Sequence, residues 1–365
     1  MSSLGIISEV LLSAISILVK EVKMKNISAT VVIIIGLLSF TVDTAHGQNW
    51  LKKRRYRKIG TDIRVSDAYG QPWSKARRYG TIGLNINAMN YLGETAPDAN
   101  ITSLRLLSTR LNFGATYTYK FTPRISARGS LSWGRIYGDD KKSASENEED
   151  NIPRFQRNLN FRNNILELNG VAIFELFENS FPYRRRPNFM PYGFIGIGVF
   201  KHNPKAYFDG EGMEAGFYEL QPLGTEGQYA EDRESKGYPK PYRLIQLAIP
   251  LGIGAKYKID ANLDIGFEIC WRKTFTDYID DISSNYADKG DLTAAKGRTA
   301  ALLSDRSADS GFTPVLTDNY GYQHISGFGL KGDQRGDISD KDWYITTGIA
   351  LYYIIPHPIK CPKPR

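Results

Sequence analysis

A two-residue alternation of apolar and polar side chains is the feature that most constrains what this chain can fold into. The clearest example is residues 243–258, in which Ile245, Leu247 and Ile249 share one face and Gln246 lies on the other. Successive side chains of a β-strand point in opposite directions, so this period is typical of strands with one apolar face. The pattern predicts an all-β fold.

The same alternation predicts eight strands, each long enough to cross a bilayer when it is tilted. They span residues 80–91, 109–121, 124–137, 161–177, 190–202, 243–258, 263–275 and 342–355. The connections alternate between short or moderate (122–123, 178–189, 259–262) and longer (92–108, 138–160, 203–242, 278–341). This asymmetry is typical of outer-membrane barrels. We predict an eight-stranded antiparallel transmembrane β-barrel over residues 79–355, with short periplasmic turns, long extracellular loops and both termini in the periplasm.

The two faces of the predicted strands differ in a way that fits lipid outside and charge inside. One face is rich in Leu, Ile and aromatic residues, and the other carries charges of both signs. A cation facing lipid near the midplane costs about 2–4 kcal/mol, so we expect the charges to pair in the lumen. The predicted lumen network is Arg110, Lys120, Arg128, Glu167, Glu175, Lys256, Asp264, Glu268 and Arg272.

Alternation alone leaves a second barrel open, a soluble lipocalin-like one with its apolar face inside. The loop asymmetry and the export signal described next favour the membrane barrel. Eight strands leave an interior just wide enough for side chains to fill, which argues against a general diffusion pore.

The N-terminus carries the pattern of a secretory signal. Met24 and Lys25 precede an apolar run over residues 27–42, and small residues around Gly47 suit cleavage there. We predict a removed targeting region at 1–47 with Met24 as the true start, the alternative being a long uncleaved anchor. A basic periplasmic linker at 48–78 and a Pro-rich periplasmic tail at 356–365 flank the barrel.

Two basic clusters stand out in the part that follows the signal. An exported protein rarely meets nucleic acid, so we exclude nucleic acid as a partner. We interpret the clusters as a periplasmic surface that docks an acidic partner or the cell wall, and solvated linker and turn charge is the alternative. The residues are Lys52, Lys53, Arg54 and Arg55 in the linker, and Arg184, Arg185 and Arg186 in a turn.

Little in the sequence points to catalysis, a metal or a cofactor. The four histidines are scattered and there are only two cysteines, Cys270 and Cys361, which we expect to be free thiols. His202 with Asp209, or His324 with Asp318, would suit a rim enzyme, but neither pair has a supporting constellation. We predict a non-catalytic protein without a cofactor.

Five short stretches resemble a family of outer-membrane β-barrel proteins from Bacteroidetes-type bacteria. They are residues 200–204 (FKHNP), 222–228 (PLGTEGQ), 272–281 (RKTFTDYIDD), 303–307 (LSDRS) and 342–344 (DWY). This family includes the PorG component of the type IX secretion system. The resemblance spans residues 79–355 and implies a barrel that anchors periplasmic secretion-ring proteins to the outer membrane. The extra N-terminal run and the Pro-rich tail depart from the family pattern.

Most of these stretches lie at strand ends or in the two longest loops, which we expect to fold together over the barrel mouth. We predict that Arg272 and Arg306 pair there with Asp277, Asp280 or Asp281. Arg335 begins an Arg-Gly-Asp tripeptide, which matches an adhesion motif but is too short to be specific. The competing functions are a structural or adhesive surface barrel acting through these loops and, less favoured, a rim enzyme.

Overall fold

The computed structural model describes residues 77–93, 95, 109–143, 152–210, 212–338 and 341–356. The predicted signal, the linker up to residue 76 and the tail after residue 356 lie outside the described residues. Within the described part, no helix is long and apolar enough to span a membrane.

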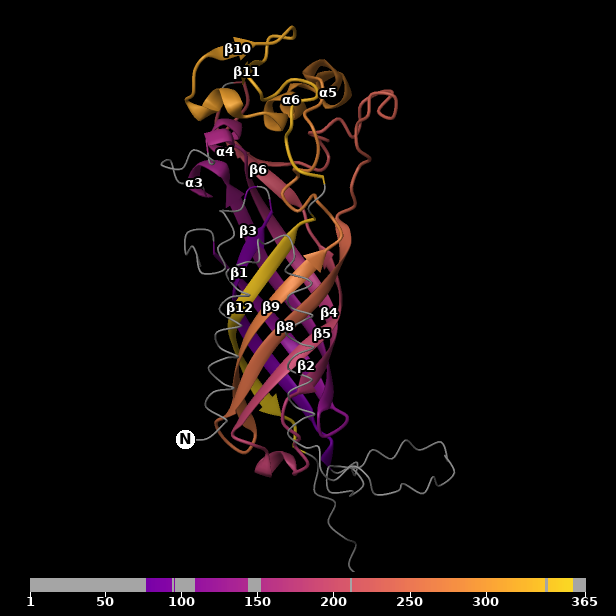
Figure 1. Ribbon diagram of the computed structural model, residues 1–365, viewed down its shortest axis with the longest axis vertical. Coiled ribbons are helices and arrows are strands. Elements are labelled where there is room, and N and C mark those ends of the chain that lie inside the picture. Colours follow the sequence, from indigo (N-terminus) through magenta and orange to yellow (C-terminus); the bar gives the residue numbers. More distant parts are fainter. Residues whose placement is uncertain are drawn as a thin grey trace, which may run out of the picture. The chain divides into compact units, whose positions relative to one another are not determined.

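Eight antiparallel strands close into a barrel (Figure 1). Neighbouring strands follow the order β3-β2-β1-β12-β9-β8-β5-β4, and pairing of β3 with β4 closes the ring. The bounds are β1 Gly80–Leu92, β2 Arg110–Lys120, β3 Ile125–Asp139, β4 Asn160–Glu175, β5 Phe189–Lys201, β8 Ile245–Lys258, β9 Leu263–Thr274 and β12 Trp343–Ile354. The predicted all-β, eight-stranded antiparallel barrel is confirmed, with every expected strand present.

The outer face of the barrel is an apolar belt. Burial alternates along each strand, and the exposed positions are the apolar ones: Leu168 is 62 % exposed and Ile197 is 74 % exposed. The register puts such residues side by side, as with Leu131 opposite Leu168 and Trp133 opposite Leu166. A soluble protein rarely exposes so wide an apolar surface, so this face is the one that meets lipid.

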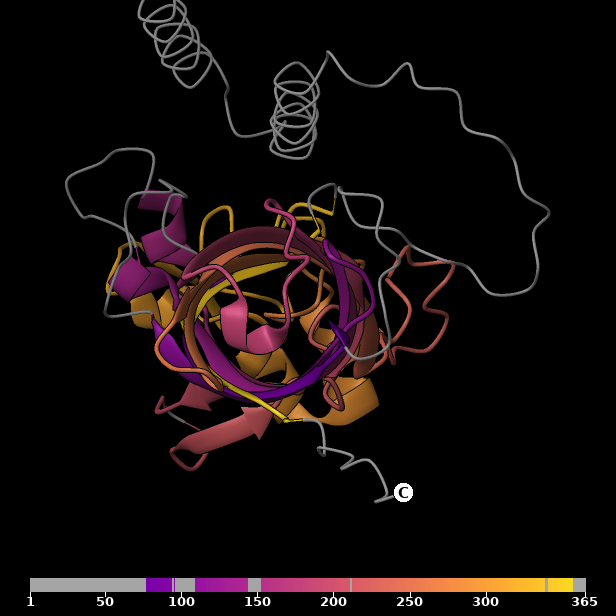
Figure 2. The ribbon, with the colours of Figure 1, turned by 90° about the horizontal axis from the view of Figure 1, so that it is seen from below.

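One end of the barrel carries only short connections, and we call it the turn end. Residues 121–124 and 259–262 form tight turns there. The connection between β4 and β5 includes the short 3₁₀ helix η4 (Tyr183–Arg185). Figure 2, seen from below, shows η4 lying across the barrel opening. Both ends of the described chain lie at this end, since β1 starts and β12 stops there.

The opposite, loop end is covered by an ordered cap, defined here as the described residues of 202–243 and 276–338. Its elements are β6 Pro204–Phe208, β7 Gly216–Glu219, α5 Lys289–Lys296, α6 Arg298–Ser304, η5 Ser307–Ser310, β10 Val315–Thr317 and β11 Gln323–Ile325. Strand β6 pairs with β4 and so extends the barrel sheet into the cap. Two short helices from the β3–β4 connection, α3 Asp140–Ser143 and α4 Ile152–Arg157, lie beside it (Figure 1).

The cap folds because its loops bury their own apolar and polar groups. Ala300, Ala301 and Leu292 pack against Tyr322, and Asp288 caps α5 by accepting hydrogen bonds from the backbone of Gly290 and Asp291. Below the cap, an apolar layer fills the loop end of the lumen. This layer consists of Met89, Tyr91, Ile136, Phe161, Ile165, Phe200, Ala248, Ile279 and Tyr344.

Candidate functional site

Inside the barrel, acidic and basic side chains from different strands meet in buried pairs. Lys120 pairs with Glu175, and Arg128 pairs with Glu268. The inward positions of these strands place the charges away from lipid, where the low dielectric strengthens each pair but also makes an unpaired charge costly. The lumen is therefore filled by paired side chains rather than left as an open channel.

The Arg272–Glu167 pair shows how completely these charges are satisfied. Arg272 Nε donates to both carboxylate oxygens of Glu167, at 3.0 and 2.8 Å. Its Nη1 donates to Thr346 Oγ1 at 2.5 Å, and its guanidinium lies 5.5 Å from the ring centroid of Tyr344. Both partners are almost fully buried. The pair holds β4 and β9 across the lumen, because these strands are not neighbours in the sheet.

Glu268 forms a second cluster, with two aromatic hydroxyl groups in addition to Arg128. Tyr192 and Tyr352 donate to Glu268 Oε1 at 2.5 and 2.6 Å. The ammonium of Lys256 lies 5.0 Å from the ring centroids of both tyrosines. Lys256 thus takes part through cation–π contacts, and in the described residues it forms no ion pair.

Of the predicted lumen set, one residue lies elsewhere. Arg110 sits at the loop end of β2, half-buried, with its guanidinium 5.0 Å from the ring centroid of Tyr137. Alternation predicts an inward side chain at this position, but Arg110 is the first residue of β2, and there its guanidinium reaches Tyr137 on the outward face of β3.

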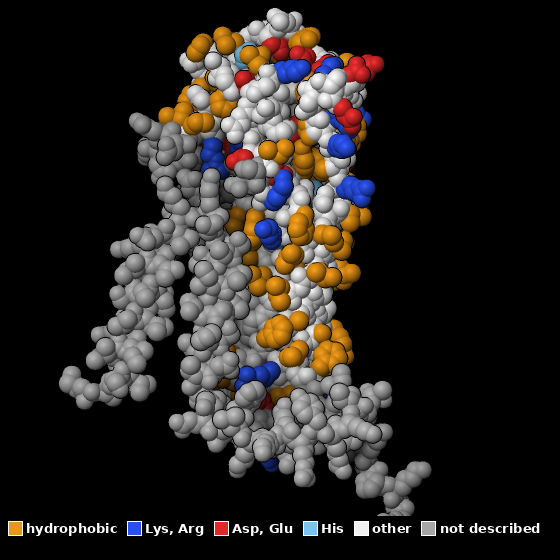
Figure 3. Space-filling model, turned by 45° about the vertical axis from the view of Figure 1, so that its right-hand side comes forward, with side chains coloured by type: hydrophobic (Ala, Val, Ile, Leu, Met, Phe, Trp, Pro, Cys, Tyr) orange, Lys and Arg blue, Asp and Glu red, His pale blue; other side chains and the backbone are white. Residues whose placement is uncertain are grey.

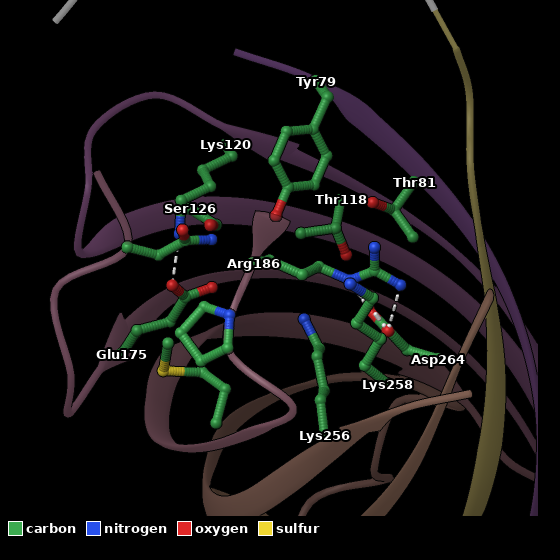
Figure 4. A pocket seen from close by; sticks show the side chains of 13 residues that line it. Tyr79, Thr81, Thr118, Lys120, Ser126, Glu175, Arg186, Lys256, Lys258 and Asp264 are labelled. Atoms are coloured by element: carbon green, nitrogen blue, oxygen red, sulfur yellow. Dashed lines mark hydrogen bonds and ion pairs between the residues drawn. The ribbon is translucent and has the colours of Figure 1, made fainter. Parts of the chain in front are cut away.

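At the turn end, a pocket opens into the lumen (Figure 4). Lys120 and Glu175 face each other on one side of it, and Arg186 and Asp264 on the other. Arg186 Nε donates to Asp264 Oδ1 at 2.9 Å, and its terminal nitrogens donate to the carbonyl oxygens of the 259–263 turn. This arginine closes the turn end of the barrel.

The position of Arg186 corrects part of our docking prediction. We grouped it with Arg184 and Arg185, but only those two are exposed. The turn of η4 rotates the third side chain inward, where Asp264 neutralises it. Of the three arginines predicted to dock a partner, Arg184 and Arg185 are the two that are exposed. Lys52, Lys53, Arg54 and Arg55 lie outside the described residues.

In the cap, the central charge is Arg335. Its Nη1 donates to Glu226 Oε1 at 2.9 Å, its Nη2 lies 3.6 Å from Asp281 Oδ2, and its Nε donates to the carbonyl oxygen of Ser304 at 3.1 Å. All three charged side chains are buried. Arg335 therefore joins three segments that are far apart in the sequence, and its burial leaves the Arg-Gly-Asp tripeptide without an exposed arginine.

The predicted loop pairs are wrong in their partners. Arg306 pairs with Asp309 at 2.8 Å and with Asp209 at 3.2 Å, and Arg272 stays in the lumen with Glu167. The acidic stretch after β9 is instead satisfied by Arg335 and by hydroxyl and backbone groups: Asp277 accepts from Ser283, and Asp280 from Thr95 and the backbone of Ile282. We did not predict Arg335 as the partner of Asp281, because 54 residues separate the two in the sequence.

Burial shapes the protonation of these cap carboxyl groups. It raises the pKa of Asp281 to about 6, against the opposing effect of Arg335. It raises the pKa of Asp277 to about 6 and that of Asp280 to about 7. The cap thus contains three acids that titrate in a range where water-exposed aspartates are fully ionised.

Neither histidine forms a hydrogen bond with the aspartate that we paired it with. His202 is buried, stacks on Tyr242 and has Nε2 3.2 Å from the carbonyl oxygen of Arg243. Burial lowers its pKa to about 4. Asp318 accepts from the backbone of the 320–322 turn, while His324 Nδ1 lies 3.2 Å from the carbonyl oxygen of Ile325. Both histidines are held in structural contacts.

Metal and thiol chemistry have little support in the described part of the chain. No group of three or more His, Cys, Asp or Glu side chains there is arranged to hold a metal ion. Cys270 is a buried free thiol facing the lumen, and Cys361 lies outside the described residues.

A domain of unknown function (DUF6089) matches residues 73–216, a range that begins seven residues before β1 and ends at the first residue of β7. No curated protein matches the sequence. The chain is an outer-membrane-type β-barrel. This assignment rests on its own strand pairing and lipid-facing belt.

Solved structures of similar fold include three outer-membrane proteins. A major outer membrane protein from Thermus thermophilus is 10% identical, with a TM-score of 0.34, and the match covers 76% of this chain and 99% of that one. Ail, the attachment invasion locus protein of Yersinia pestis, is 9% identical, with a TM-score of 0.32 and coverage of 76% and 97%. OprG from Pseudomonas aeruginosa is 9% identical, with a TM-score of 0.30 and coverage of 76% and 98%.

Proposed function

We propose that this protein is a non-catalytic outer-membrane component of a type IX, PorG-like secretion machinery, and that it anchors a periplasmic complex. The turn end faces the periplasm in this proposal, with both termini there, because outer-membrane barrels carry their short turns on that side. The motif resemblance over residues 79–355 supplies the type of machinery.

The observation that carries the anchoring role is the structure of the turn end. Arg184 and Arg185 are exposed on η4, while the next residue, Arg186, is locked to Asp264 inside the barrel. A surface cation on a rigidly fixed turn loses little freedom when a partner binds it. The two arginines suit an acidic protein surface in the periplasm, since opposite charges across an interface promote and orient association.

Closure of the lumen supports an anchor over a conduit. Buried ion pairs fill the interior and Arg186 closes the turn end, so the barrel offers no path wide enough for a polypeptide.

The test is crosslinking in the native outer membrane, followed by solubilisation and identification of the proteins that co-purify. Arg184→Glu/Arg185→Glu reverses the charge of the docking surface and is expected to remove periplasmic partners. The matched control is Arg243→Glu/Lys273→Glu, which makes the same charge change on exposed residues at the loop end. An unchanged partner list in the first variant would remove the docking role.

The second candidate is a structural or adhesive surface barrel that acts through the cap. The ordered, internally paired cap favours it, because a rigid surface suits recognition. Deletion of residues 278–341 would then abolish surface binding while secretion continues, whereas an anchor predicts that the partners at the turn end are retained.

A further inference from the structure

The outward face of the barrel carries an arginine pair that anchoring at the turn end does not use. Arg135 on β3 and Arg162 on β4 lie at the loop end of the apolar belt. In the register of these strands, Trp133 lies opposite Leu166, and the next outward pair is Arg135 opposite Asn164. Arg162 follows two residues further along the same face of β4. Figure 3 shows lysine and arginine side chains gathering near the loop end, with the hydrophobic band below them.

Local contacts hold both guanidinium groups in place. Arg135 Nε donates to Asn164 Oδ1 at 2.7 Å, which fixes the plane of its guanidinium beside the amide. The guanidinium of Arg162 stacks on Phe217, 3.4 Å from the ring centroid, and its Nε is buried without a hydrogen-bond partner. The two arginines and the Asn164 amide together offer several donors side by side.

Two carboxylates on neighbouring strand segments, Glu219 and Asp139, have other partners in the described part of the chain. Lys205, opposite Arg162, already pairs with Glu219 at 2.7 Å. Asp139, further along β3, accepts a hydrogen bond from Tyr137 at 2.5 Å. Arg162 lies close enough to Arg135 for the two positive charges to repel each other. In the register of β3 and β4 the two arginines are diagonal neighbours, and a bound anion would offset the repulsion between them.

We propose that Arg135, Arg162 and Asn164 bind the phosphate group of an anionic lipid in the leaflet at the loop end. Guanidinium groups bind phosphate through paired, charge-assisted hydrogen bonds. The apolar strip of Trp133, Leu166 and Leu168 continues directly toward the membrane centre, where the acyl chains of that lipid pack. This strip favours a lipid over free phosphate as the source of the anion.

The test is native mass spectrometry of the full chain in detergent, titrated with dioleoyl phosphatidic acid, dioleoyl phosphatidylcholine or inorganic phosphate. The wild type is expected to bind phosphatidic acid at least about tenfold more tightly than phosphatidylcholine. Arg135→Gln/Arg162→Gln is expected to bind phosphatidic acid about tenfold more weakly than the wild type, because it loses hydrogen bonds to a charged group. The matched control is Arg243→Gln/Lys273→Gln, which removes the same charge from exposed residues elsewhere on the rim and retains binding.

Three results would overturn the proposal: equal binding of both lipids by the wild type, an equal loss in the control variant, or displacement of the lipid by inorganic phosphate at an equal concentration. Heat-dependent migration in gels reports whether each variant is folded. Should the glutamine variant not fold, Arg135→Lys/Arg162→Lys decides, because lysine keeps the charge but not the paired hydrogen bonds. If the lysine variant loses affinity for phosphatidic acid, by less than the tenfold expected for the glutamine variant, the site is supported. If its affinity for phosphatidic acid is unchanged, the site is contradicted.

Discussion

Replacement of one partner in the Arg272–Glu167 pair tests whether the lumen charges stabilise the barrel by pairing. In Glu167→Leu, Arg272 keeps its hydrogen bond to Thr346 and its contact with Tyr344, but its charge is left buried without a counterion. In Arg272→Met, Glu167 keeps a hydrogen bond of 3.5 Å from Ser132 but has no cation beside it among the described residues. Breaking a buried pair from one side costs about 3–5 kcal/mol, which lowers the folding equilibrium constant by about 100-fold to about 4,000-fold.

The double variant Glu167→Leu/Arg272→Met gives a sharper result, because it removes both charges at once. Exchange of a buried pair for apolar side chains of similar size is often neutral. We expect the double variant to lie within about 2 kcal/mol of the wild type, so that the two single losses do not add. The control is Lys205→Met, which breaks the pair with Glu219. That pair has a similar N–O distance of 2.7 Å, but its side chains are 29 % and 47 % exposed, and we expect a loss below about 1 kcal/mol.

The assay is equilibrium unfolding in urea of the barrel refolded into lipid vesicles, followed by tryptophan fluorescence. The free energies of unfolding of the two single variants, the double variant and the control are compared at a common slope. Single losses no larger than that of Lys205→Met would refute the argument, and so would a double variant that loses the sum of both. Either result would mean that water reaches the pair and screens it.

Two further predictions concern the cap. The pKa of Asp280 is about 7 in the folded cap, above its usual value of 3.8. Between these two pH values the folded cap binds more protons at this group than the unfolded chain does. The contribution of Asp280 to cap stability is therefore fully present below about pH 4 and is lost as the pH rises through 7. Hydrogen exchange of residues 276–338 should show that protection of the wild-type cap falls from pH 5 to pH 8. The fall should be less steep in Asp280→Asn, and a wild-type protection that does not change with pH would contradict this prediction. Arg335→Met leaves Glu226 and Asp281 buried without their cation, which lowers the stability of the cap by about 3–5 kcal/mol. Residues 276–338 should therefore lose protection from hydrogen exchange, while strands β1 to β5 keep theirs. Arg233→Met, at an exposed pair with Glu234, is the control, and an equal effect there would refute the role of Arg335.

The strands could be predicted from the sequence because lipid on one side and a packed lumen on the other make apolar and polar side chains alternate along each strand. The segment expected at 124–137 is β3 at Ile125–Asp139, and the one expected at 263–275 is β9 at Leu263–Thr274. On β9 every outward position from Leu263 to Trp271 is apolar, so the signal there is strong, and on β3 Leu131 and Trp133 carry it. Short cap strands such as β6 and β7 carry no such repeat, and they form only because β4 offers an edge to pair with.

The sequence predicts which strand residues place a charge in the lumen better than it predicts which charges pair with one another. Inward charges on the strands follow from the alternation, but the alternation does not say which strand faces which across the lumen. Arg186 shows the limit at a turn: a run of three arginines predicts one surface, yet one turn of 3₁₀ helix directs the last of them into the barrel. Arg335 shows the limit over distance, since 109 residues separate it from Glu226.

A filled lumen restricts where any function of this protein can reside. The buried pairs and Arg186 close the interior, the apolar layer around Phe200 and Tyr344 separates it from the cap, and the cap covers the far end. In the described residues the lumen is occupied by paired side chains, so we expect ligands to bind either in the turn-end pocket or on the outer surfaces rather than along the barrel axis. Two of these surfaces carry fixed cations without carboxylate partners in the described residues, Arg184 and Arg185 at the turn end and Arg135 with Arg162 at the loop end of the belt. If the proposals for both hold, the barrel fastens an acidic periplasmic partner at one end and an anionic lipid at the other, and reversal of either pair should leave the other contact intact.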